Sequence, residues 1–92
     1  MKKKHEALFV VLNEKGLHTR PSIELVKCAA HFHAHVSLIY KNYVVNAKSI
    51  MGILMLAAGR GAKIGIQAVG EDAESAVAAI VQLAKQRFNI KY

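Results

Sequence analysis

The chain has 92 residues, of which 53% are hydrophobic and 21% are charged, so its composition is that of a globular protein and not of a disordered one. This length predicts one domain of residues 1–92 that buries roughly 60–65% of its unfolded surface without disulfides or metal ions. The net charge of +7 comes from largely scattered lysines and arginines that no aromatic residues interleave. This pattern argues against nucleic-acid binding and favours attraction to an acidic protein partner.

No segment is typical of secretion or of membrane insertion. The start, Met1-Lys2-Lys3-Lys4, is basic, but the apolar run Leu8–Leu12 is far shorter than the core of a signal peptide. No apolar run approaches the ~20 residues that span a bilayer. The lone cysteine, Cys28, excludes an internal disulfide and fits a reducing compartment. We therefore expect a cytoplasmic protein.

The first two predicted elements are a strand and a helix. Residues 6–12 are rich in β-branched and aromatic side chains, which predicts a well-buried strand that ends at Asn13–Gly16. A helix is predicted from Pro21, with the proline at its first position, where a missing N–H is tolerated. Apolar residues then recur at helical spacing, at Leu25, Val26, Ala29 and Phe32.

A hairpin follows. His35–Tyr40 alternates polar and apolar residues as a half-buried strand does, Lys41-Asn42 is a turn, and Tyr43–Val45 is the partner strand. Tyr43 stands where a glycine would accept a positive φ without strain.

The second half of the chain continues the alternation of helices and strands. Ser49 is expected to cap a short helix that runs through Leu56 and closes at Gly59-Arg60-Gly61. Lys63–Val69 alternates as a strand, and residues 73–87 carry the clearest amphipathic stripe. The order βαββαβα predicts an α+β fold, an open-faced β-sandwich with a four-stranded antiparallel sheet covered on one face by three helices.

The segment Gly16-Leu17-His18-Thr19-Arg20-Pro21 joins the first strand to the first helix. His18 is expected just outside the helix, where free N–H groups, the positive end of the helix dipole and the Arg20 guanidinium converge. Thr19 or Ser22 can organise the first turn. A lone histidine beside a proline is more often an ordinary surface or capping residue, but this combination is suited to a phosphorylated histidine.

These residues resemble the active-site motif of HPr, the histidine-containing phosphocarrier family of the bacterial sugar phosphotransferase system. Lys48-Ser49-Ile50-Met51-Gly52 resembles the regulatory-serine segment of that family, and Gly70-Glu71-Asp72-Ala73 resembles the turn before its last helix. The resemblance extends from about residue 6 to residue 88. It implies that His18 carries the phosphoryl group on Nδ1 and that Arg20 stabilises the phosphate.

The resemblance also implies partners. Members of the family receive phosphate from enzyme I and pass it to the IIA domains of sugar permeases, so the chain is expected to be a monomeric carrier without a cofactor and not a stand-alone enzyme. HPr kinase/phosphorylase and a transcriptional regulator are candidate partners through Ser49. The alternative is a mainly regulatory HPr-like binding module in carbon or nitrogen signalling, read according to the state of Ser49.

Ser49 has two compatible interpretations, a simple N-cap and a site of regulatory phosphorylation at a helix N-terminus. The neighbouring helix is too short to bury every side, so of Ile50, Met51, Leu54 and Met55 we expect some in the core and the rest in an exposed docking patch near His18. We name as docking residues Thr19, Ile50, Met51, Leu54 and Met55.

The remaining histidines and the cysteine carry no strong signal. His31, His33 and His35 fall across a helix-to-strand boundary, so surface histidines are favoured over a metal site. Cys28 lies on a helix without an activating base and is interpreted as a small apolar residue.

The chain departs from the family pattern in its high net charge, at Asn42-Tyr43, where many relatives have an Asn-Gly turn, and at two further positions. Lys15 stands where many relatives have asparagine, and Ala57 stands where many have glycine. Neither change touches His18 or Arg20.

Overall fold

The computed structural model describes residues 3–92, and its centre is one four-stranded sheet. Every neighbouring pair of strands is antiparallel, and the strands lie in the order β1-β4-β2-β3. The strands are β1 (Lys4–Val10), β2 (His35–Tyr40), β3 (Tyr43–Asn46) and β4 (Lys63–Val69).

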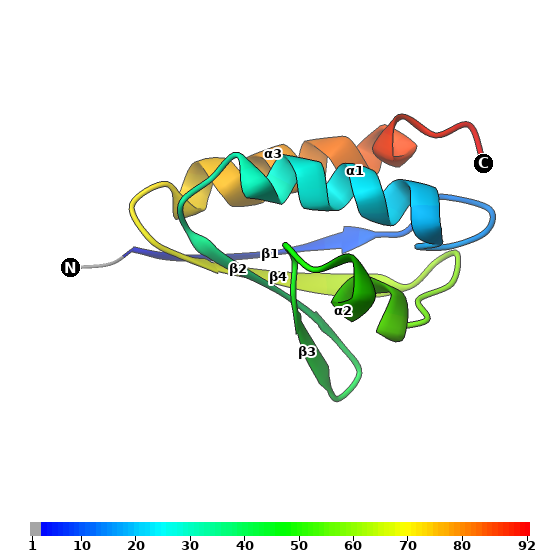
Figure 1. Cartoon of the computed structure of the whole chain (residues 1–92), viewed down its shortest axis with the longest axis horizontal. Helices are drawn as coiled ribbons and strands as arrows, with labels where there is room; N and C mark the ends of the chain where they lie inside the picture. The colour runs from blue at the N-terminus through cyan, green and yellow to red at the C-terminus, as the bar shows by residue number, and fades with distance from the viewer. Residues whose placement is uncertain (1–2) are drawn as a thin grey trace.

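Three α-helices accompany the sheet: α1 (Thr19–Ala30), α2 (Ile50–Met55) and α3 (Ala73–Lys85). The helices α1 and α3 lie side by side across the sheet, and the short α2 lies beside β3 (Figure 1). The order βαββαβα and the open-faced antiparallel sandwich predicted from the sequence are thereby confirmed.

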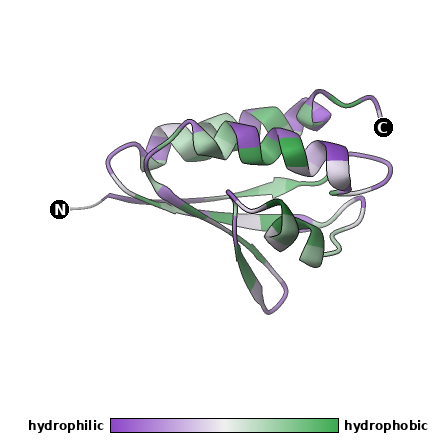
Figure 2. Ribbon diagram, viewed as in Figure 1, coloured by the Kyte–Doolittle hydropathy of each residue, from purple (hydrophilic) through white to green (hydrophobic). Residues whose placement is uncertain are grey.

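The two faces of the sheet differ in burial. Val36 and Leu38 of β2 and Ile64 and Ile66 of β4 are fully buried against the helices, as the alternation in both strands predicts. On the opposite face Leu8 is 66% exposed, so the helices cover one face only. Figure 2 shows that α2 is hydrophobic over most of its length, although it is short and lies at the edge of the fold.

The first strand and the hairpin differ in detail from the predicted elements. The strand β1 spans Lys4–Val10 in place of residues 6–12, but Val11 still donates to the Ala62 carbonyl at 2.9 Å and accepts from the Gly61 N–H at 2.8 Å. In the hairpin loop the positive φ falls on Lys41 (55°) and not on Tyr43. Tyr43 is therefore free to begin β3 with ordinary strand geometry.

The last helix ends at Lys85 and not at residue 87. Arg87, Phe88 and Asn89 all have positive φ values, of 54°, 55° and 61°, and form a short left-handed turn. Phe88 is fully buried and meets Phe9 edge to face at 5.9 Å. The turn sends the last residues back towards the start of α1, where the chain ends beside the loop that precedes this helix (Figure 1).

Candidate functional site

The loop that precedes α1 is fixed by its contact with the segment after α2. Gly16 has φ +70°, and a Cβ at this position would collide with the Ala58 carbonyl oxygen. The next N–H, that of Leu17, donates to the same carbonyl at 2.9 Å, and the Leu17 side chain is buried. Glycine is therefore required here both for the left-handed backbone and for the close approach.

His18 is the N-cap of α1. Its carbonyl accepts the Ser22 N–H at 3.1 Å, and its side chain makes no capping hydrogen bond, so no N–H of α1 engages the ring nitrogens. The sequence predicts that Pro21 is the first residue of the helix, whereas the structure has it as the third. The helix can start earlier because no N–H of the first turn has a partner inside the helix, so proline is tolerated at each of these positions.

Of the two residues expected to organise the first turn, the structure assigns this task to Ser22. Its buried hydroxyl donates to the Leu17 carbonyl at 3.1 Å. Thr19 is exposed, and its hydroxyl makes no hydrogen bond within residues 3–92. The main chain on both sides of His18 is thus held by hydrogen bonds, while Thr19 faces outward.

Tyr92 covers His18. The two rings are stacked with centroids 5.9 Å apart and an interplanar angle of 17°. The Tyr92 main-chain oxygen lies 3.4 Å from Nε2 of His18. The same residue therefore meets the imidazole with its ring and with its backbone.

Two cations flank the Tyr92 ring. Arg20 Nη1 donates to the Tyr92 hydroxyl at 2.7 Å, and the guanidinium carbon lies 5.9 Å from the ring centroid. Lys15 Nζ lies 5.0 Å from the same centroid. His18, Arg20 and Lys15 thus surround one aromatic ring, which gives the site a positive character suited to an anion.

Asn13 binds the main chain of the C-terminal residues 87 and 92. It is fully buried, and its Nδ2 donates to the Arg87 carbonyl at 2.9 Å and to the Tyr92 main-chain oxygen at 3.2 Å. In the sequence, Asn13 is predicted only to end a strand, and Tyr92 has no predicted role. No local signal connects them, because these contacts join residues more than 70 positions apart.

Ser49 is the N-cap of α2, and its Oγ accepts the Gly52 N–H at 3.0 Å. The prediction of a serine cap is confirmed. The four apolar residues named as docking residues on α2 are all exposed, so the expectation that some of them belong to the core is wrong. Their exposed fractions are Ile50 37%, Met51 74%, Leu54 38% and Met55 70%. Ile53 alone anchors α2 in the core.

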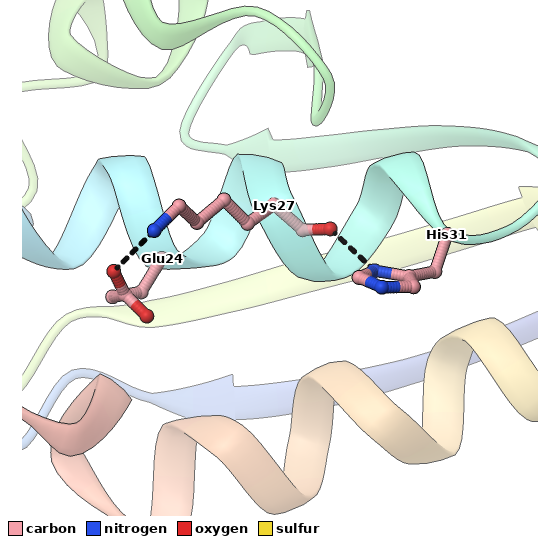
Figure 3. A network of polar contacts seen from close by, with 3 residues as sticks. All are labelled: Glu24, Lys27 and His31. Atoms are coloured by element: carbon pink, nitrogen blue, oxygen red, sulfur yellow. Dashed lines mark hydrogen bonds and ion pairs between the residues drawn. The ribbon is translucent and has the colours of Figure 1, made fainter.

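The three neighbouring histidines do not converge on one site. His31 caps the end of α1, where its Nδ1 lies 2.8 Å from the Lys27 carbonyl oxygen, and Lys27 pairs with Glu24 at 3.6 Å on the same helix (Figure 3). His33 and His35 are exposed beyond the helix. In the part of the chain that the structure describes, no three His, Cys, Asp or Glu residues are grouped as metal ligands.

Cys28 is half-buried on α1, and burial raises the pKa of its thiol. A raised pKa keeps the sulfur protonated and poorly nucleophilic at neutral pH.

Among residues 3–92 no helix has both the length and the apolar character needed to cross a membrane.

Comparison with known proteins identifies one family. Residues 5–86 match the family described as "PTS HPr component phosphorylation site". The phosphocarrier protein HPr of Xylella fastidiosa (strain 9a5c) is 41% identical over 80 residues, which cover 87% of this chain and 90% of that protein.

Solved structures agree with the sequence comparison. The crystal structure of HPr-C-His from Thermoanaerobacter tengcongensis has a TM-score of 0.90 at 35% identity, with 96% of this chain and 99% of that chain covered. The HPr structure from Bacillus anthracis str. Ames has a TM-score of 0.82 at 39% identity, with 86% and 94% covered.

Proposed function

This chain belongs to the HPr family of phosphocarrier proteins, and from this premise we propose that it relays a phosphoryl group through Nδ1 of His18. The donor would be enzyme I, and the acceptors would be the IIA domains of sugar permeases. The observation that carries the proposal is the position of His18 at the N-cap of α1, with a ring free of capping bonds and with Arg20 beside it. The protein would act as a carrier and not as a stand-alone enzyme.

The contacts of His18 support attack by Nδ1. When Nε2 carries the ring proton, it can donate to the Tyr92 main-chain oxygen at 3.4 Å, and the lone pair then resides on Nδ1. In the transfer step this lone pair forms the new N–P bond as the bond between phosphorus and the donor breaks, with its electron pair leaving on the donor. In the second transfer the acceptor attacks the same phosphorus, the N–P bond breaks, and its electron pair returns to Nδ1 of His18.

Arg20 and the first turn of α1 would stabilise the transferred group. A guanidinium presents a planar fork of donors to phosphate oxygens, and the free N–H groups at a helix N-terminus favour an anion. Phosphoryl transfer depends chiefly on alignment and charge stabilisation, which a small exposed site can offer to successive partners.

Ser49 is our candidate for a second, regulatory phosphorylation by HPr kinase/phosphorylase. Its side chain is already at the N-terminus of α2, where added negative charge is favourable. Such a phosphate would lie next to Ile50 and Met51, which we propose as docking residues together with Thr19, Leu54 and Met55. Modification of Ser49 would then change which partners bind.

We further propose that the protein works as a cytoplasmic monomer without a cofactor. A mainly regulatory role remains the alternative function, in which the state of Ser49 would be read by a transcriptional regulator and His18 would carry little phosphate.

The decisive experiment is incubation with enzyme I and labelled phosphoenolpyruvate. The carrier proposal expects acid-labile, base-stable label on the wild type and none on His18→Ala. His33→Ala, which removes an exposed histidine outside the site, is the control and should be labelled normally. A wild-type protein that takes up no label would falsify the relay and leave the regulatory role.

A further inference from the structure

We propose that Tyr92 is a removable cap on the site, and that its ring leaves the space between Lys15, His18 and Arg20 when a phosphoryl group enters. This inference rests on the proposed function of His18 and concerns how access to that histidine is controlled. The cap is Tyr92 itself, and the segment that carries it is the tail, residues 90–92.

The cap engages the groups that would meet a phosphoryl group. Its ring lies against the His18 imidazole at 5.9 Å and 17°. Its hydroxyl oxygen accepts from Arg20 Nη1 at 2.7 Å, as a phosphate oxygen would. A phosphoryl group on His18 would compete with Tyr92 for the same guanidinium.

The exchange is favoured by charge. Lys15 Nζ and the Arg20 guanidinium lie 5.0 Å and 5.9 Å from the centroid of the Tyr92 ring, so two cations share one uncharged aromatic partner. Cation–π contacts at exposed sites are weaker than hydrogen bonds between cations and a phosphate dianion. Phosphorylation would therefore draw both cations away from the ring and release it.

The tail is held loosely enough to move. Phe88 is fully buried and anchors the preceding turn, whereas Tyr92 is 36% exposed. Its main-chain oxygen accepts from Asn13 Nδ2 at 3.2 Å, the long end of the normal hydrogen-bond range, and lies 3.4 Å from His18 Nε2, beyond that range. A cavity of about 240 Å³ lies between Arg20 and residues 89–92, so the ring has adjacent space to enter.

The test measures access to His18 without any phosphoryl donor. Diethyl pyrocarbonate acylates unprotonated imidazole nitrogens, and peptide mass spectrometry gives the rate at each histidine. In Tyr92→Ala the rate at His18 should rise about fivefold, the ratio that corresponds to about 1 kcal/mol of lost stacking. Tyr92→Phe, which keeps the ring and loses the bond to Arg20, should fall between the two.

Two controls isolate the cap. Tyr43→Ala removes an exposed tyrosine from β3 and should leave the rate at His18 unchanged, and the rate at His33 should be the same in every variant. In the wild type, nuclear Overhauser contacts between the His18 and Tyr92 ring protons should be present. Equal rates at His18 in wild type and Tyr92→Ala, or absent ring contacts, would overturn the cap.

Phosphorylation by enzyme I separates this inference from the proposed function. If Tyr92→Ala accelerates acylation of His18 while the wild type takes up no phosphate, Tyr92 is supported as a cap and the phosphoryl relay is refuted. If Tyr92→Ala leaves acylation of His18 unchanged while the wild type is phosphorylated normally, the relay is supported and the role of Tyr92 as a cap is refuted. If both hold, Tyr92→Ala should also be phosphorylated faster than the wild type.

Discussion

Arg20 contributes to the site through the geometry of its donors as well as through its charge. Its side chain is exposed, and Nη1 reaches the Tyr92 hydroxyl beside His18. Arg20→Lys keeps the charge and loses the planar fork, so we expect phosphoryl transfer to slow by ~10-fold, the loss of one charge-assisted hydrogen bond. Single-turnover phosphorylation by enzyme I measures this rate.

The control for Arg20 is Arg60→Lys, which makes the same change at an exposed arginine in the loop before β4. It should transfer phosphate at the wild-type rate. Equal rates for Arg20→Lys and the wild type would mean that charge alone suffices at this position.

Asp72 makes the stability of the fold depend on pH. Its carboxylate accepts the His33 and Ala34 N–H groups, each at 2.8 Å, and the His33 bond is the main reason that the pKa of this carboxyl is lowered. A group with a lowered folded pKa stabilises the protein fully above its unfolded pKa, and this contribution is lost as pH falls through the folded pKa.

Asp72→Asn should therefore lower the melting temperature at neutral pH and flatten the fall of stability with acid. Thermal melts of the two proteins between neutral pH and strong acid check both parts. Glu71→Gln, a neighbouring exposed carboxylate for which no hydrogen bond or ion pair is found among residues 3–92, serves as the control and should keep the wild-type profile. Parallel profiles for Asp72→Asn and wild type would contradict the role of this carboxylate.

At the residue scale, the local sequence predicts the position of His18 at a helix start but not the stacking of Tyr92 on its ring. The pattern around His18 specifies the start of a helix, because capping and proline preferences act over a few neighbouring residues. Tyr92 reaches His18 only because three successive residues, 87–89, adopt positive φ. None of the three is glycine and only Asn89 is of a type that favours positive φ, so the sequence does not predict this turn.

At the scale of elements, α2 has a favourable start and a strained end. Ser49 caps its N-terminus, but Ala57, just after the helix, has φ 48°, a conformation that costs a residue with a Cβ roughly 1–2 kcal/mol. The departure from glycine noted in the sequence thus falls at a left-handed helix end.

Ala57→Gly should stabilise the protein by about 0.5–1 kcal/mol, since relief of this strain exceeds the added entropy of the unfolded chain. Urea unfolding measures the change. Ala78→Gly, on the exposed face in the middle of α3, is the matched control and should destabilise by about 1 kcal/mol. The prediction fails if both substitutions destabilise.

The elements with strong periodicity were predicted best. The bounds of β2 and β4 agree with the sequence prediction, because β4 alternates over its whole length, and β2 over most of it, between a buried and a more exposed face. The ends of β1, α1 and α3 moved by two residues, because tertiary contacts or a tolerated proline decide where such elements stop. In the second half of β1 the outward residues Leu8 and Val10 are also apolar, so no alternation marks where this strand stops.

At the scale of the whole molecule, packing of α1 against α2 brings the site and the exposed apolar residues onto neighbouring elements. Met51 is the most exposed of these residues, at 74%, and a flexible thioether suits a surface that must accept several partners. We therefore expect Met51 to contact both the donor and the acceptor of phosphate.

Met51→Asp should slow transfer from enzyme I and to a IIA domain by ~10-fold, because it puts a charge into an apolar interface. The free energy of unfolding should change by no more than about 0.5 kcal/mol, since the side chain is exposed. Leu8→Asp makes the same kind of change on β1, at the opposite end of the strand order from β3, and should leave transfer unaffected. Slowing by Met51→Asp alone assigns docking to α2, whereas equal slowing by both would attribute it to the altered net charge of +7.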